Sequence, residues 1–246
     1  MQGAGVVIPA FNESENIFIL LGKIFHFLPS ATVLIVDDSN PLENKKLINS
    51  LTRIPAQQRK QVTVVSRNKK SGRGSAVRDG LTQLQQNKKI TYFFEMDADL
   101  AHDPKDFQKF FDAVKKNKAD VVIGSRYLEN STIEKWPLWR LVLSKLYNKG
   151  INVWLNLNLS DYTNGFRLYN RRAVEFLTKI TLREKGFIAL SEIAYRLKSN
   201  NFVVVEIPIT FTDRTHGKSN ATGKEYLSAL LGILRIKLLP LRRKNS

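Results

Sequence analysis

The chain has 246 residues, no cysteine and a formal charge of +17, because 39 lysines and arginines outnumber 22 aspartates and glutamates. This length is sufficient for a full hydrophobic core, and the missing cysteines exclude disulfides, thiolate nucleophiles and cysteine-bound metals. The strong positive charge favours an anionic partner, which can be a nucleic acid, an anionic membrane or a phosphorylated substrate.

Strands and helices alternate through the first half of the chain. Short runs rich in apolar, β-branched and aromatic residues predict strands at 5–9, 32–36, 62–65, 92–96 and 120–124. Between them, capping residues and apolar residues at helical spacing predict helices that begin near 14, 41, 73 and 104. This alternation predicts an α/β fold with a mostly parallel, doubly wound sheet and right-handed crossovers.

Acidic residues follow two of the predicted strands. Asp37 and Asp38 follow the second strand, and Asp97 and Asp99 follow the fourth. Open α/β sheets bind ligands at the carboxyl ends of their strands, and two carboxylates there suit Mg²⁺ or Mn²⁺ bridging a diphosphate. Taken alone, such a pair also fits an ordinary solvated turn. Three scattered histidines do not make a zinc site: His26, His102 and His216.

A basic loop with two glycines, residues 67–76, follows the third predicted strand and opens a helix. The N-terminus of a helix presents backbone N–H groups that can bind phosphate. A tight turn between strand and helix explains the same glycines equally well. The loop is therefore a candidate phosphate site, but the loop alone does not distinguish phosphate binding from a tight turn.

The composition then changes. Tryptophan, leucine and basic residues are mixed over 136–147 and 151–159, which predicts a pair of helices. These helices either lie in a membrane interface, with the indoles at headgroup depth, or pack on the core. Further helices are predicted at 173–177 and 186–197, and a last strand at 203–209.

The C-terminal residues are apolar and then basic. We therefore divide the chain into an α/β domain over 1–220 and an amphipathic basic tail over 221–246, which we expect to associate with a membrane. No stretch reaches the roughly 18 uncharged apolar residues that a membrane-spanning helix needs. The N-terminus lacks the pattern of a secretory signal, so we expect the chain to be exposed to the cytosol.

Seven motifs occur in an order and spacing that identify a family. They are Ile8-Pro9-Ala10-Phe11-Asn12-Glu13, Val36-Asp37-Asp38-Ser39, Gly72-Arg73-Gly74-Ser75-Ala76, Met96-Asp97-Ala98-Asp99, Gly124-Ser125-Arg126-Tyr127, Thr163-Asn164-Gly165-Phe166-Arg167 and Asp213-Arg214. The chain resembles the inverting GT-A glycosyltransferases of family 2 over about residues 6–219. Within that family it is most similar to the dolichyl-phosphate (polyprenyl-phosphate) mannose synthases. The resemblance implies a GT-A, Rossmann-like fold with C-terminal amphipathic helices.

The resemblance also assigns residues to the nucleotide-sugar donor. The residues implied to hold the base and ribose are Pro9, Phe11, Glu13, Val36 and Asp38. Asp97, Ala98 and Asp99 are implied to meet the diphosphate, with Asp97 and Asp99 as ligands of the Mg²⁺ or Mn²⁺ ion. Arg214 matches a position that contacts the donor.

A second set of residues is assigned to the acceptor phosphate. Arg126, Arg140 and Ser144 match positions that receive it. The resemblance therefore implies catalytic roles for Asp99, Arg126 and Arg140.

Three positions depart from the pattern of the family. Phe11 stands where an aromatic residue with a hydroxyl is usual, so stacking on the base is retained and one hydrogen bond is lost. Ala101 replaces a common glutamine ligand of the metal, which puts the identity and affinity of the metal in question. Asn220 stands where a lysine is usual, and the nearby Lys218 is a candidate replacement for that charge.

The implied reaction is transfer of a sugar, by resemblance mannose from GDP-mannose, onto a polyprenyl or dolichyl phosphate. An alkyl phosphate has a second pKa near 6, so it is largely dianionic at pH 7 and needs no general base. The arginines would position two mutually repelling phosphate groups, and the metal would neutralise the leaving diphosphate. The acceptor lipid implies peripheral binding to an anionic membrane at its cytoplasmic face, with or without a small membrane subunit.

Two alternatives stay open at this point. The donor can be UDP-glucose or another nucleotide sugar, and the acceptor can be a hydroxyl group of a glycan or glycolipid. A hydroxyl acceptor would need a base, for which Asp161 and Glu192 are the candidates. A nucleic-acid-binding protein is disfavoured, because the basic residues are dispersed and the acid pair would repel phosphate without a metal.

Overall fold

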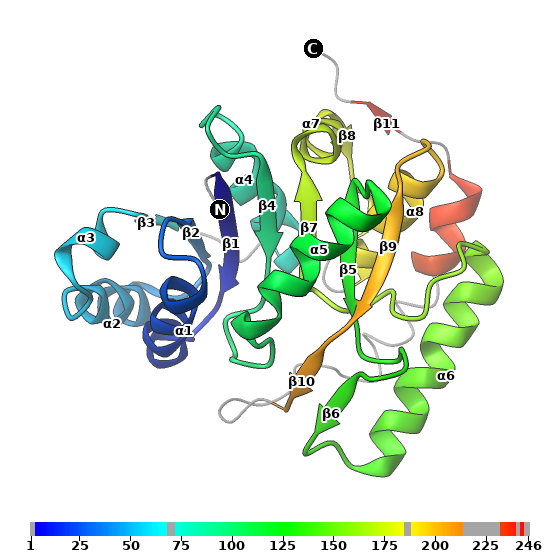
Figure 1. The fold of residues 1–246 in the computed structure, drawn as a ribbon, viewed down its shortest axis with the longest axis horizontal. Helices are drawn as coiled ribbons and strands as arrows, with labels where there is room; N and C mark the ends of the chain where they lie inside the picture. Colours follow the sequence, from blue (N-terminus) through cyan, green and yellow to red (C-terminus); the bar gives the residue numbers. More distant parts are fainter. Residues whose placement is uncertain (1–2, 68–71, 185–187, 214–231, 240–241, 244–246) are drawn as a thin grey trace.

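The computed structural model describes residues 3–67, 72–184, 188–213, 232–239 and 242–243. A central sheet has the strands β1 (Ala4–Ala10), β2 (Thr32–Asp37), β3 (Val62–Ser66), β4 (Tyr92–Glu95), β5 (Val121–Ser125), β7 (Arg167–Asn170) and β9 (Val204–Pro208). Their order across the sheet is β3-β2-β1-β4-β7-β5-β9 (Figure 1). Every pair of neighbours is parallel except the two that β7 makes with β4 and β5. The predicted mostly parallel α/β sheet is confirmed.

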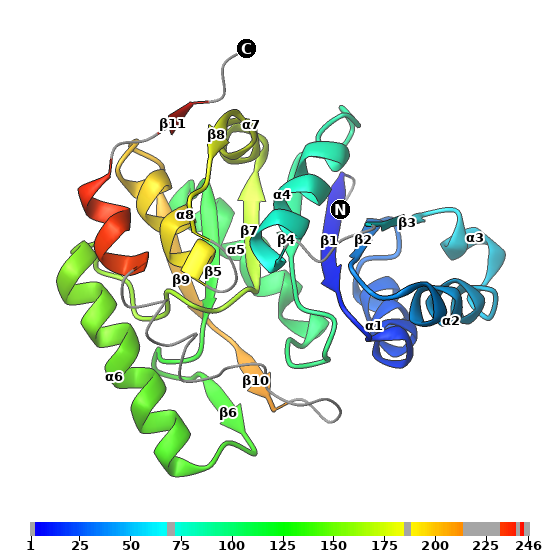
Figure 2. The same cartoon turned by 180° about the vertical axis from the view of Figure 1, so that it is seen from behind.

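Helices cover both faces of this sheet. The helical elements are α1 (Ser14–Phe27), α2 (Pro41–Leu51), α3 (Ala56–Arg59), α4 (Arg73–Leu84), η1 (Pro104–Asp106), α5 (Phe107–Asn117), α6 (Leu138–Leu155), α7 (Arg171–Lys179) and α8 (Ile188–Lys198). Two small sheets lie outside the central one: β6 (Thr132–Glu134) with β10 (Thr210–Thr212), and β8 (Ile180–Thr181) with β11 (Arg242–Arg243). Helices α1, α2 and α5 lie on one face of the central sheet, and α4, α7 and α8 lie on the other (Figure 2).

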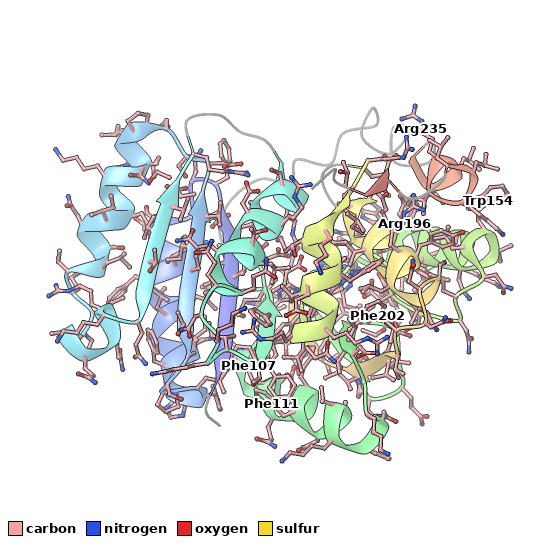
Figure 3. The ribbon with its side chains drawn as sticks, turned by 90° about the horizontal axis from the view of Figure 1, so that it is seen from above. Phe107, Phe111, Trp154, Arg196, Phe202 and Arg235 are labelled. Atoms are coloured by element: carbon pink, nitrogen blue, oxygen red, sulfur yellow. The ribbon has the colours of Figure 1, made fainter. Side chains whose placement is uncertain are left out.

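The core explains why these strands form where they do. Val6, Val7 and Ile8 of β1 are fully buried and alternate between two hydrophobic clusters, one on each face of the sheet. A strand that is covered on both faces needs a nearly continuous apolar sequence, as β1 and β2 have. On one face, Phe107 and Phe111 of α5 pack against Phe94 of β4 (Figure 3).

The predicted pair of helices at 136–147 and 151–159 is wrong. Residues Leu138–Leu155 form the single helix α6, and the chain from 156 to 166 is irregular. Gly150 does not interrupt the helix, because its cost of about 1 kcal/mol is offset when the next turn buries Ile151 and Leu155. The helix ends at Asn156, whose backbone is left-handed with φ of 54°.

The described part of the tail lies against the rest of the molecule. Residues 232–238 are helical and bury Ile233 and Ile236 in the core cluster that includes α8. The Trp154 indole N–H donates to the Ile233 carbonyl at 3.1 Å, and Figure 3 labels Trp154 beside this helix. These two isoleucines face the protein, whereas Leu238 is exposed. No described helix has the length and apolar composition needed to cross a membrane.

Candidate active site

A pocket lies at the carboxyl ends of β1, β2 and β4 and at the start of α4. Its walls are formed by Pro9, Ala10, Phe11, Glu13, Asp38, Gly72, Arg73, Ala76, Asp97, Ala98 and Asp99. Every residue assigned to the donor lines this pocket except Val36 and Arg214. The Val36 side chain is buried in the core, so only its backbone faces the edge of the sheet. Arg214 lies outside the described residues, as do Lys218 and Asn220.

The Asp38 carboxylate is held by an arginine that the sequence analysis did not single out. Arg67 donates from Nε to Asp38 Oδ1 at 2.5 Å and from Nη2 to Oδ2 at 2.6 Å. Its Nη1 group donates to Ser75 and Asp79, both at 2.9 Å. The hydrogen bonds with Asp38 raise the pKa of Arg67, so the guanidinium of this bidentate pair stays charged. The pair fixes Asp38 at the rim of the pocket. In the sequence, the only indication of Arg67 was its place at the start of the basic loop 67–76.

The backbone of Asp97 is held by a buried histidine. The Asp97 N–H donates to His102 Nδ1 at 3.1 Å, so the proton of the ring is on Nε2, which donates to Asn164 Oδ1 at 2.8 Å. The Asn164 amide then donates to the Gly124 carbonyl at the end of β5. Through Asn164, His102 thus ties the turn at Asp97 to the end of β5, on the far side of β7 in the sheet. In the sequence, the only indication that His102 contacts Asp97 was its place five residues after it.

Asp97 and Asp99 fit a metal that takes most of its ligands from elsewhere. The Asp99 carboxylate accepts the Ala101 N–H at 3.2 Å, which orients it in the turn after β4. Ala101 is buried and offers no side-chain oxygen. Among the described residues no group of three or more histidine, cysteine or acidic side chains could hold a metal. Two carboxylates suit Mg²⁺ or Mn²⁺ when phosphate and water complete the shell.

A cation already lies beside Asp97. Arg73 Nη1 contacts Glu95 Oε1 at 2.5 Å, and its Nη2 contacts Asp97 Oδ1 at 2.7 Å. Burial would lower the pKa of this guanidinium, but the two carboxylates outweigh burial and the pKa is raised. Arg73 therefore remains charged in the pocket. Arg73 lies within the motif Gly72-Arg73-Gly74-Ser75-Ala76, whose glycines predicted a phosphate loop but no role for the arginine.

Arg126, which was predicted to receive the acceptor phosphate, is buried beside this pocket. It contacts Asp161 from Nε at 2.7 Å and from Nη2 at 2.9 Å, and Nη2 also donates to Thr163. Burial opposes the charges of both groups, yet their attraction raises the pKa of Arg126 and lowers that of Asp161. The Asp97 carboxylate adds to the rise in the pKa of Arg126. The two predicted phosphate sites are thus electrostatic neighbours.

The other two acceptor residues come from α6. The guanidinium of Arg140 lies 4.3 Å from the centre of the Trp136 ring, and Arg126 lies 5.4 Å from the same ring. Arg140 also forms an ion pair with Asp213 at 3.0 Å. The Ser144 hydroxyl is 2.5 Å from that of Tyr127, the residue after Arg126. The structure therefore brings the three acceptor residues together, while their contact with a phosphate stays a prediction.

Both candidate bases, Asp161 and Glu192, are buried and hydrogen-bonded within the protein. Asp161 is fully buried and its carboxylate accepts the N–H groups of Thr163 and Asn164 besides the Arg126 guanidinium. Glu192 is also buried, and it accepts the N–H groups of Arg183 and Glu184. The structure thus gives both acids structural hydrogen bonds, and a role for either as a general base stays untested.

Comparisons with known proteins agree with this geometry. A family model described as glycosyl transferase family 2 matches residues 5–178. A polyprenol monophosphomannose synthase of Mycolicibacterium smegmatis is 34% identical over 228 residues, which cover 93% of this chain and 84% of that protein. An undecaprenyl-phosphate mannosyltransferase of Micrococcus luteus is 30% identical over 229 residues, which cover 93% of this chain and 91% of that protein.

Solved structures show the same fold at low sequence identity. The glucosyl-3-phosphoglycerate synthase of Mycobacterium tuberculosis, solved with Mn²⁺, UDP-glucose and phosphoglyceric acid, has a TM-score of 0.65 at 15% identity. That match covers 97% of this chain and 81% of the solved one. A structure described as a mycobacterial protein has a TM-score of 0.68 at 14% identity, with 97% and 76% covered.

Proposed function

Because the chain belongs to glycosyl transferase family 2, we propose that it transfers mannose from GDP-mannose to a polyprenyl phosphate, with inversion, at a membrane surface. The two relatives with 30–34% identity are named for mannose transfer to polyprenol or undecaprenyl phosphate. The single observation that carries the proposal is the arrangement of charge. An acidic pocket for a metal and diphosphate adjoins a separate site where Arg126 and Arg140 contact one tryptophan ring.

The arginine site suits an acceptor that is itself a phosphate. A phosphate monoester is largely dianionic at pH 7, so it can attack the anomeric carbon without losing a proton to the protein. Arg126 and Arg140 would bind its oxygens and reduce its repulsion from the donor diphosphate. Asp161 keeps Arg126 charged and oriented for this contact. The burial of both candidate bases supports the same acceptor class, because a hydroxyl acceptor would need a base.

Asp97 and Asp99 would hold the metal of this reaction, Mg²⁺ or Mn²⁺. When bound there, the ion would neutralise charge that develops on the leaving nucleoside diphosphate. The Mn²⁺ in a solved glycosyltransferase of the same fold supports a divalent ion of this kind. Pro9, Phe11, Glu13 and Asp38 would meet the nucleotide, with the Phe11 ring stacking on the base.

Helix α6 would carry the protein to its lipid acceptor. Arg140 and Ser144 of this helix face the site, whereas Leu138, Trp139 and Leu143 are exposed. The exposed Lys145 and Lys149 follow these apolar residues on the same helix, so the exposed side suits an anionic interface. A lipid chain leaving the arginine site would thus meet the membrane beside its own phosphate. Binding at the cytoplasmic face, and a tail over 221–246 that adds to it, belong to the same proposal.

The test is transfer of radiolabel from nucleotide sugars to a polyprenyl phosphate that is extracted into an organic phase. Purified protein is assayed with GDP-mannose, UDP-glucose and UDP-N-acetylglucosamine, with Mg²⁺ or Mn²⁺. Label from GDP-mannose alone would support the whole proposal, and label from another donor would correct the sugar. Hydrolysis of the donor without labelled lipid, also after addition of membranes that could supply a subunit, would contradict the phosphate acceptor.

A further inference from the structure

Arg73 is the first residue of α4, and its guanidinium lies in the donor pocket between two acidic side chains. Its Nη1 group is anchored on Glu95, which is fully buried and also accepts the Tyr169 hydroxyl at 2.8 Å. Its Nε and Nη2 groups lie 2.8 and 2.7 Å from the same oxygen of Asp97. The arginine therefore has one buried partner, Glu95, and one partner at the pocket wall, Asp97.

The neighbouring backbone is shaped to admit this side chain. A Cβ at Gly165 would lie 1.9 Å from Arg73 Nη2 and 2.7 Å from its Cζ, so only a glycine leaves room for the guanidinium. The Gly165 carbonyl also accepts from Nη2 at 3.5 Å. Gly165 belongs to the motif that carries Asn164, which holds His102 and through it Asp97. The guanidinium is thus held by two separate segments of the chain, residues 95–97 and Gly165.

The charges explain what this arrangement would do. A buried Glu95 requires a cation, and Arg73 satisfies it with Nη1 alone. The remaining donors face Asp97, the side chain that the proposed function assigns to the metal and diphosphate. Ala101 adds no ligand at this site. A fixed guanidinium can therefore supply part of the positive charge that a diphosphate needs there.

We propose that Arg73 is a donor-binding residue that contacts the diphosphate and shares Asp97 with the metal. This inference rests on the proposed function for the identity of the ligand as a nucleoside diphosphate. It has two consequences. Nucleoside diphosphate should bind to some extent without a divalent ion, because one cation is built into the pocket. Metal alone should bind weakly, because Arg73 already neutralises Asp97.

The test uses a charge-balanced variant, because removal of Arg73 alone would leave Glu95 buried without a cation. Arg73→Gln combined with Glu95→Gln removes the pair and keeps an acceptor for Tyr169. Binding of GDP, UDP and pyrophosphate is measured by calorimetry in EDTA, and binding of Mn²⁺ alone by electron paramagnetic resonance. Arg78→Gln on the same helix controls for a general loss of positive charge, and Arg73→Lys tests whether charge without the planar fork suffices.

The expected result is that the wild-type chain binds a nucleoside diphosphate in EDTA and that the double variant binds it at least about tenfold more weakly. The same variant should bind Mn²⁺ alone more tightly, while Arg78→Gln changes neither value. Equal binding by wild type and double variant would overturn the inference, as would the absence of any metal-free binding. If UDP binds and GDP does not, the proposed donor fails, and the role of Arg73 is then decided with UDP.

Discussion

The exposed side of α6 offers a prediction that can be quantified. Trp139 and Leu143 are 65% and 59% exposed and lie one helical turn apart. Burial of apolar area contributes about 25 cal/mol per Å², which makes a fully buried leucine worth roughly 2.5 kcal/mol and a tryptophan more. If their exposed area enters the interface, the pair contributes about 3–5 kcal/mol as an upper bound. Trp139→Ser with Leu143→Ser should thus reduce partitioning at least about thirtyfold, or 2 kcal/mol.

The assay is flotation with vesicles that contain anionic lipid, at physiological salt. A matched control is Leu42→Ser with Ile48→Ser on α2, because these side chains are 67% and 49% exposed and α2 lies at the opposite end of the molecule from α6 (Figure 1). The control should float like the wild type. The α6 variant should also keep its activity toward a short, water-soluble polyprenyl phosphate. Unchanged flotation of the α6 variant would refute this helix as the docking surface.

Three further predictions concern the site. Asp99→Ala should abolish transfer, whereas Asp112→Ala on the exposed side of α5 should not, and retained turnover in the first variant would exclude the metal role. Asp161→Asn should cost about 3–5 kcal/mol of unfolding free energy at pH 7, because it leaves the Arg126 cation buried. The lowered pKa of Asp161 stabilises the folded protein at pH values above the unfolded pKa near 4, and this stability is lost as the pH falls through the folded pKa. The unfolding free energies of wild type and variant should therefore converge in acid denaturation curves. His102→Phe keeps an aromatic ring beside Phe166 but removes the hydrogen bond to the Asp97 backbone. Activity should therefore fall about 10–100-fold, and more metal should be needed to reach half-maximal activity. An unchanged metal titration would count against a positioning role for His102.

Much of the donor pocket was predictable because its residues follow strands that the sequence marks clearly. The acids after β2 and β4 each follow a continuous apolar run, and parallel neighbours bring those ends to one edge. The motifs then placed Pro9 and Phe11 beside Asp38 without knowledge of the structure. Strand β7 was missed because it is short and lies antiparallel between β4 and β5, where its neighbours rather than its own pattern make it a strand.

The sequence by itself determined the strands of the central sheet other than β7, the acidic edge and the family, because local hydrophobic patterns and short motifs record them. Only the tertiary structure decided which charges meet. Asp161 resembled a base and is the partner of Arg126, 35 residues away, because a buried guanidinium requires an anion. Arg73 resembled part of a glycine loop and reaches Glu95 at the end of β4 and Asp97 just after it. Such pairs depend on the approach of distant segments, which no local pattern specifies.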